Sequence, residues 1–246
     1  NKREFQGKWD FRLKEQELAN LLKVPAGSKV FMMDMGDLFH SDIPWNMMLR
    51  VFSFMAVMPW VTFQLLTKRP GRMAHFAEHI WPQYRDHFIT VPWNWPPNVW
   101  AGTSVESQKY APRLDCLARV PAKVRFVSVE PMLGPVDLTP WLPDFNHDRC
   151  EAWDIPGHQD DLGALSWTIA GGESGPGARP MDLAWAKSLR NQCAAAGVPF
   201  FMKQLGRYPK GREDERWLTE DSRRDAKGGD MDFWPEDLRV REMPRV

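Results

Sequence analysis

The sequence predicts an α/β fold: a partial (β/α) barrel of the TIM type, with parallel strands and flanking helices. Short apolar runs recur along the chain, and each run ends in polar or glycine residues before a stretch with helical spacing. Strands that alternate with helices form parallel sheets with right-handed crossovers. Six such units favour a barrel or partial barrel over an open sheet, although propensity alone leaves both arrangements open.

The composition is that of a single soluble domain. The chain has 246 residues, 43% of them hydrophobic, and 32 Lys and Arg balance 32 Asp and Glu. This length is ample for one core, so we expect one domain over residues 1–246. No apolar stretch reaches the roughly 18 residues that cross a bilayer, and the charged start is unlike a signal peptide. We therefore expect a cytoplasmic protein with no membrane partner. Zero net charge argues against a generic polyanion binder but leaves room for a local basic patch.

The cysteines do not form a recognisable framework. Cys116, Cys150 and Cys193 lie far apart and are odd in number. A disulfide scaffold is therefore not expected, and a reducing compartment is the default. The chain also begins without Met, which suggests a processed or truncated start.

The six expected strands are the apolar runs at 30–33, 61–66, 98–103, 124–129, 167–170 and 198–202. Runs such as FQLL and PFFM are unbroken, which predicts strands that are buried on both faces. Pro44 suits the first turn of the helix after the first run. The last helix has Asp182 as its cap and Gly197 as its stop, and its spacing places Cys193 in the core.

Polar side chains gather where these strands end. In parallel α/β folds, ligands bind outside the carboxyl ends of the strands. A single charged residue there is usually a solvated loop residue, but every strand of this chain ends in one. The sequence thus predicts a shared polar pocket. Its candidate residues are Asp34, Asp37, Lys68, Arg69, Ser104, Glu106, Glu130, Glu173, Lys203 and Gln204.

The segment GGESGPG at residues 171–177 follows the fifth strand directly. Its glycines allow close approach to a ligand and expose amide N–H groups. It is neither a Walker loop nor a dinucleotide fingerprint. The alternative is a tight turn at the barrel end, in which Glu173 pairs with Arg179.

Seven ordered motifs carry a resemblance to a known family. They are MGDLFH, LLTKRPGRM, GTSVES, SVEPMLGP, GGESGPGARP, FFMKQLG and KGGDMDFWPEDLRVREMP. Together they resemble an uncharacterised family of phages and bacteria, described as phage protein Gp thirty-seven/Gp sixty-eight. The resemblance runs from about residue 30 to the C-terminus.

A more distant resemblance is to radical S-adenosylmethionine barrel proteins. It implies S-adenosylmethionine and a [4Fe–4S] cluster, held by three cysteines in a C-x-x-x-C-x-x-C loop after the first strand. This sequence has no such loop, so the chain alone supports neither cofactor. Either the loop lies upstream of Asn1 in the full-length protein, or this member has lost the cluster and kept the barrel.

The radical-enzyme resemblance also implies roles by strand position. The residues that it places on the cofactor are Asp34, Gly36, Asp37, Ser104, Glu106, Glu130, Gly171, Gly172 and Glu173. The residues that it places on the carboxylate or phosphate of a substrate are Lys68, Arg69, Arg179, Lys203 and Gln204. No catalytic residue is assigned.

Other patterns are weaker. His75 and His79 have zinc-site spacing, but the third ligand is unclear, so we expect a solvated helix face and no metal site. The Trp-rich stretch at 93–100 is more typical of packing than of base stacking. We expect a surface insertion at about 144–165 and a charged C-terminal extension at about 207–246 that packs back on the barrel.

The leading functional hypothesis is a radical-S-adenosylmethionine-like barrel that acts on a nucleotide or nucleic-acid substrate. The alternative is a non-catalytic phage accessory or nucleic-acid-associated binding protein. Both hypotheses include a small-molecule or nucleotide ligand, with nucleic acid as a candidate partner. A metal hydrolase is a third class, which would require stoichiometric zinc or manganese.

Overall fold

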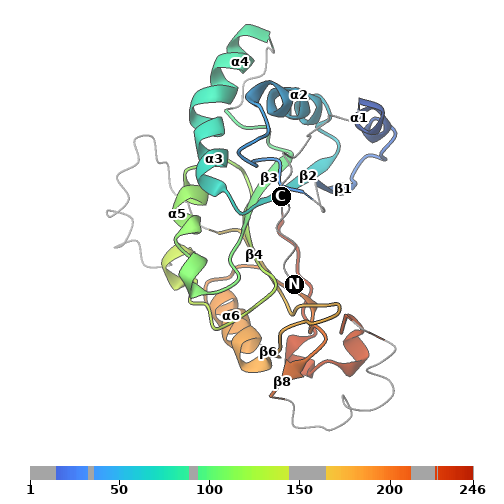
Figure 1. Cartoon of the computed structure of the whole chain (residues 1–246), viewed down its shortest axis with the longest axis vertical. Coiled ribbons are helices and arrows are strands. Elements are labelled where there is room, and N and C mark those ends of the chain that lie inside the picture. Colours follow the sequence, from blue (N-terminus) through green and yellow to red (C-terminus); the bar gives the residue numbers. More distant parts are fainter. Residues whose placement is uncertain are drawn as a thin grey trace.

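The computed structural model describes residues 15–32, 36–88, 94–143, 165–211, 225 and 227–245. Its centre is a sheet of six parallel strands in the order β1-β2-β3-β4-β5-β7, curled into a half-barrel that helices flank (Figure 1). The predicted fold class is therefore confirmed. The strands are β1 (Lys29–Met32), β2 (Thr62–Thr67), β3 (Val99–Ser104), β4 (Arg125–Val129), β5 (Trp167–Gly171) and β7 (Phe200–Gln204).

Helix α1 precedes β1, and the other helices lie between successive strands of the sheet. They are α1 (Glu15–Leu21), α2 (Trp45–Ala56), α3 (Pro70–His75), a π-helix (Phe76–Ile80), α4 (Trp81–Phe88), α5 (Arg113–Ala118) and α6 (Leu183–Ala195). Short 3-10 turns cover Gln108–Tyr110, Thr139–Trp141, Met231–Phe233 and Glu236–Leu238. Strands β6 (Met181–Asp182) and β8 (Pro209–Lys210) form a separate parallel pair. Within the described residues, no helix combines the length and the apolar character that crossing a membrane requires.

Helix α6 shows how local sequence sets an element's ends. The Asp182 side chain accepts a hydrogen bond from the backbone N–H of Ala184, which satisfies one of the free amides of the first turn. Gly197, with φ of 66°, ends the helix. Cys193 is fully buried on the inner face. All three expectations for this helix are confirmed.

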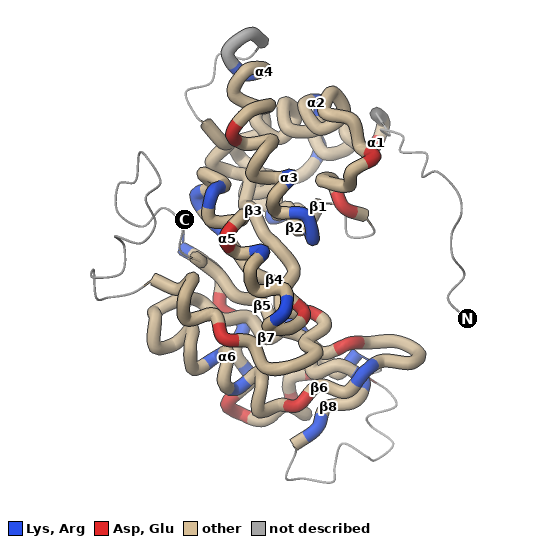
Figure 2. The backbone as a smooth tube through the Cα atoms, turned by 60° about the vertical axis from the view of Figure 1, so that its left-hand side comes forward, with Lys and Arg blue, Asp and Glu red and all other residues tan. Residues whose placement is uncertain are grey.

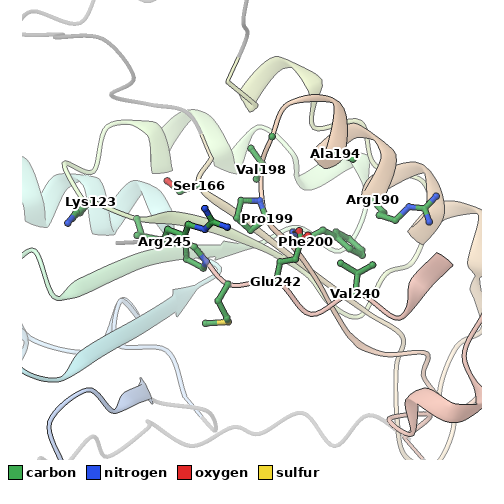
Figure 3. Close-up of a pocket in the computed structure, with 14 residues that line it drawn as sticks. Lys123, Ser166, Arg190, Ala194, Val198, Pro199, Phe200, Val240, Glu242 and Arg245 are labelled. Carbon is green, nitrogen blue, oxygen red and sulfur yellow. The ribbon is translucent and has the colours of Figure 1, made fainter. Parts of the chain in front are cut away.

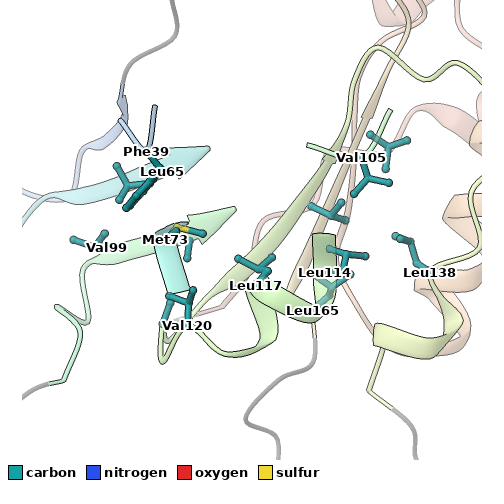
Figure 4. Close-up of a cluster of buried hydrophobic side chains, with 14 of the residues drawn as sticks. Phe39, Leu65, Met73, Val99, Val105, Leu114, Leu117, Val120, Leu138 and Leu165 are labelled. Carbon is teal, nitrogen blue, oxygen red and sulfur yellow. The ribbon is translucent and has the colours of Figure 1, made fainter. Parts of the chain in front are cut away.

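The main core lies between the helices and one face of the sheet. Alternate strand residues, such as Leu65 and Val99, join helix residues such as Met73 and Leu117 in it (Figure 4). Burying this apolar surface is the dominant favourable contribution to folding. The opposite, concave face carries a smaller cluster of Trp100, Val124, Phe126 and Trp167, against which Leu66, Ile169, Phe201 and Met243 pack.

Burial differs between central and outer strands. Strands β3 and β4 are buried on both faces, whereas β2 alternates, with Gln64 and Leu66 only partly buried. In β7, Phe201 is likewise partly buried. The prediction that FQLL and PFFM are buried on both faces is therefore wrong. A half-barrel leaves its concave face partly uncovered at these outer strands.

The C-terminal residues 227–245 run back along β7. The Met202 amide donates to the carbonyl of Val240 at 2.8 Å, and the Glu242 amide donates to that of Phe200 at 2.9 Å. The side chain of Arg241 donates to the carbonyl of Met202 at 3.2 Å. This segment pairs the edge of β7, which would otherwise present free backbone groups. Of the insertion expected at about 144–165, residues 144–164 lie outside the described residues, as do residues 212–224 of the expected C-terminal extension.

Candidate ligand-binding site

The carboxyl ends of the six strands meet at one edge of the sheet, because all neighbouring strands are parallel. We call this edge of the sheet the carboxyl edge. Acidic and basic residues lie close together on it near β5 and β7 (Figure 2). Its polar residues are Asp37, Lys68, Arg69, Ser104, Glu106, Arg113, Glu130, Glu173, Arg179 and Lys203.

Asp37 joins the segment after β1 to the end of β2. One carboxylate oxygen accepts from the Thr67 hydroxyl at 2.7 Å and from the Phe39 amide at 2.9 Å. The other accepts from the Arg69 guanidinium at 2.7 Å. Its contacts are thus largely satisfied within the protein, and its first role is to hold this loop. Asp34 lies outside the described residues.

Glu106, just after β3, is the most enclosed carboxylate of the edge: its side chain is only 8% exposed. One oxygen pairs with Lys68 and the other accepts from Arg113 at 3.0 Å. Burial alone would raise the pKa of Glu106, but hydrogen bonding to Lys68 and the charges of both cations outweigh it and lower that pKa. Glu106 is therefore ionised at neutral pH.

Arg113 was not predicted from the sequence, because it lies on helix α5 rather than at a strand end. Its guanidinium donates to the carbonyl of Ser104 at 2.7 Å and stacks on the Tyr110 ring at 4.4 Å. These contacts fix its direction toward Glu106. No motif in the sequence indicates that Arg113 contacts Glu106. The contact forms because α5 packs near the end of β3.

Glu130 and Lys203 pair across an intervening strand. The Lys203 ammonium donates to the Glu130 carboxylate at 2.9 Å, although β5 lies between β4 and β7. The residue of β5 under this pair is Gly171, where an added Cβ would lie 3.3 Å from the Glu130 carboxyl. The absence of a side chain at Gly171 thus leaves the space in which the pair forms.

Gly172 and Gln204 serve the backbone instead. A Cβ on Gly172 would lie 2.2 Å from the carbonyl oxygen of Leu205, which no side chain tolerates. The Gln204 amide is buried and donates to the Gly172 carbonyl at 2.9 Å. Gly206, with φ of 80°, packs against the same point. Gly172 and Gln204 therefore hold the ends of β5 and β7 together.

Glu173 and Arg179 form the pair that the turn interpretation predicts. The Arg179 Nε and Nη2 atoms donate to the two carboxylate oxygens at 2.7 and 2.9 Å. Hydrogen bonding to Arg179 lowers the pKa of Glu173 to about 2. The same hydrogen bond raises the pKa of Arg179, and the charge of Glu106 adds to that rise. Arg179 thus lies within electrostatic reach of Glu106.

The described cysteines and histidines do not form a metal centre. Cys116 is on α5 and Cys193 is buried on α6, where burial raises the pKa of its thiol to about 11. Neither is at the carboxyl edge, and Cys150 lies outside the described residues. The His75 and His79 rings lie 4.8 Å apart. Among the described residues no group of three His, Cys, Asp or Glu side chains is placed to hold a metal.

A groove of 980 Å³ lies at the other end of the sheet (Figure 3). Its lining includes Val124, Ser166 and Phe200 from the amino ends of β4, β5 and β7. Ligands of parallel α/β folds bind at the carboxyl ends, where this chain also places its paired charges. We therefore take the carboxyl edge as the candidate site.

Comparison with known proteins gives one family. A family model described as "Protein of unknown function (DUF5131)" matches residues 1–235. The chain belongs to this family. No curated protein and no solved structure matches it. The family's description names no activity, so the resemblances to phage protein Gp thirty-seven/Gp sixty-eight and to radical S-adenosylmethionine proteins stay predictions.

Proposed function

We propose that the carboxyl edge binds S-adenosylmethionine and that the chain is the half-barrel of an enzyme related to radical S-adenosylmethionine proteins, acting on a nucleotide or nucleic-acid substrate. The observation that carries this proposal is the enclosed, ionised Glu106 between Lys68 and Arg113. An enclosed carboxylate costs free energy unless cations pair with it. Enclosed carboxylates with a shifted pKa and specific charged partners are often found at functional sites.

The polar groups of the edge suit the charged methionine end and the ribose of this ligand. S-adenosylmethionine carries an ammonium and a carboxylate on its methionine part, a sulfonium, and a ribose diol. Glu106 and Glu130 supply oxygens that accept from an ammonium or a hydroxyl. Lys68 and Lys203 are 57% and 54% exposed, so their ammonium groups remain open to a ligand carboxylate.

The concave face of the sheet offers the adenine ring an apolar surface. Leu66, Ile169 and Phe201 are only partly buried on the concave face. Ile169 and Phe201 are direct neighbours in the β5–β7 pairing. A flat base laid against these side chains would cover apolar surface that the protein itself leaves open.

Within the site, each residue has a distinct task. Lys68 turns from Glu106 to the ligand carboxylate, while Arg113, fixed by Tyr110 and Ser104, keeps Glu106 in place. Radical chemistry needs an iron–sulfur cluster on cysteine thiolates. The described cysteines do not fit such a cluster, so we derive no step through it.

Isothermal titration calorimetry with S-adenosylmethionine tests the proposal. We expect saturable binding that weakens about tenfold in Glu106→Gln, since one charge-assisted hydrogen bond is lost. Glu236→Gln removes an exposed carboxylate of the turn that contacts α6 and should bind as the wild type does. S-adenosylhomocysteine and ATP serve as comparison ligands. Absence of binding to the folded wild-type chain would overturn the proposal.

A further inference from the structure

An exposed basic and aromatic segment follows β7. We call it the basic strip; it consists of Arg207, Tyr208 and Lys210. Tyr208 is 49% exposed, which makes it one of few large hydrophobic side chains left open to solvent. The Arg207 Nε donates to the Tyr208 hydroxyl at 3.1 Å. Among the described residues, no carboxylate forms an ion pair with Arg207 or Lys210.

Backbone contacts hold the basic strip beside the carboxyl edge. The Arg207 amide donates to the Glu173 carbonyl at 2.9 Å, and the Met181 amide donates to the Tyr208 carbonyl at 3.1 Å. The backbone of Lys210 lies in register with that of Asp182 in the β6–β8 ladder. The strip is therefore positioned by regular hydrogen bonding, which reduces the entropy lost when it binds a partner.

The chemistry of the strip differs from that of the carboxyl edge. At the edge each cation has a carboxylate partner, whereas Arg207 and Lys210 have none among the described residues. A single exposed aromatic residue is normal on protein surfaces. An exposed ring flanked by two unpaired cations, however, combines the two groups that bind single strands: a face for a base and charges for phosphates.

We propose that the basic strip binds single-stranded nucleic acid, with a base stacked on Tyr208 and neighbouring phosphates on Arg207 and Lys210. This surface is separate from Glu106, and its function does not depend on S-adenosylmethionine. The chain as a whole has zero net charge, so the attraction is local rather than general.

Fluorescence anisotropy of labelled 15-nucleotide oligo-dT and oligo-U tests the stacking contact. In low salt we expect saturable binding by the full chain. Tyr208→Ala should weaken it about tenfold because a stacked base loses its partner. Tyr208→Phe keeps the ring and should bind as the wild type does. No binding by the wild type, or equal binding by the alanine variant, would overturn the proposal.

The salt dependence tests the phosphate contacts. Each lost contact to a single strand should reduce the slope of log K against log salt by about 0.7. We expect this change in Lys210→Gln. Lys123→Gln, a matched exposed cation at the amino end of the sheet, should leave the slope unchanged. Equal effects of the two substitutions, or equal competition by a glutamate-rich peptide, would show unspecific charge and overturn the proposal.

The two proposals fail separately. Tyr208→Ala should bind S-adenosylmethionine as the wild type does, because Glu106 and its partners are untouched. Oligonucleotide binding without any S-adenosylmethionine binding would overturn the proposed function and support the strip. That outcome would favour a nucleic-acid-associated binding protein.

Discussion

The two ends of the same strands use polar side chains in opposite ways. At the amino ends, Asn98 and Arg125 are buried and donate to main-chain carbonyls. At the carboxyl ends, Glu106 and Glu130 pair with Lys68 and Lys203, whose side chains are more than half exposed. The hydrogen bonds given for the two amino-end side chains go to the main chain, whereas the two carboxyl-end carboxylates pair with flexible lysine side chains.

The two kinds of partner differ in how freely they can be exchanged. A main-chain carbonyl cannot leave its donor without disturbing the fold, whereas a lysine on a flexible stem can exchange one carboxylate for another. Burial lowers the pKa of Arg125 to about 10, so its charge persists at neutral pH, and the carbonyls of Val120 and Ala122 accept hydrogen bonds from it. The amino ends therefore carry structure, and the carboxyl ends can accept a ligand.

The largest predicted effect is at the amino end. The Asn98 amide donates to the carbonyls of Met55, Met58 and Val61 at 2.9 to 3.0 Å, which ties β3 to the end of α2. Asn98→Ala removes a buried side-chain donor from these three carbonyls, of which those of Met55 and Met58 keep a backbone donor. We expect the free energy of unfolding to fall by about 3 kcal/mol, measured by urea denaturation.

Asn94→Ala is the matched control. Asn94 is exposed, and its side-chain oxygen accepts a hydrogen bond from Arg85 at 2.7 Å. Its loss should change the free energy of unfolding by less than about 0.5 kcal/mol. Similar effects of the two substitutions would contradict the structural role of the amino end.

The next largest effect on stability is expected at two adjacent glycines, Gly171 and Gly172. Comparing them tests whether every part of the carboxyl edge can adapt to a new side chain. Gly172→Ala forces a Cβ against the Leu205 backbone and should cost about 2 kcal/mol of stability. For Gly171→Ala the atoms nearest to the new Cβ belong to the flexible Glu130 side chain, at 3.3 Å, so the change should cost less than about 1 kcal/mol. Thermal and urea unfolding of the two variants compare them directly. A larger loss for Gly171→Ala would show that the Glu130–Lys203 pair is part of the scaffold.

Much of the fold was predictable because periodic signals are local. Alternating strands and helices, and the cap and stop of α6, follow from residues within one element. The exposure of Gln64, Leu66 and Phe201 was not predictable, since it depends on how far the sheet curls. An apolar run has the same sequence whether other residues cover the second face of the strand or leave it exposed to solvent.

The site was predictable to the extent that it follows strand ends. Parallel strands bring their carboxyl ends together, and this placed Lys68, Glu106 and Lys203 at one edge. Arg113 could not be found this way, because it reaches the edge from a helix. The backbone role of Gly172 was also hidden, since a glycine's sequence does not tell whether a ligand or another chain segment approaches it.

The smallest predicted effect concerns Glu173. It measures how little the Glu173–Arg179 pair at the carboxyl edge adds to the stability of the fold. The pKa of Glu173 is about 2 in the folded chain, below its ordinary value of 4.5, because Arg179 donates hydrogen bonds to it. A lowered carboxyl pKa adds stability above about pH 4.5, and this stability is lost as the pH falls toward 2. Glu173→Gln removes this dependence.

Thermal unfolding at pH 6 should therefore give a melting temperature for Glu173→Gln that is lower by roughly 2 °C or less, since exposed ion pairs contribute little. The difference should shrink as the pH falls toward 2, where the wild-type carboxyl is already about half protonated. Glu236→Gln should show no such convergence. If the difference in melting temperature stayed the same from pH 6 to pH 2, Glu173 would stabilise the fold through packing rather than through its charge. A small, titrating contribution is what a pair at a ligand site should show, because a pair that held the fold strongly could not open for a ligand.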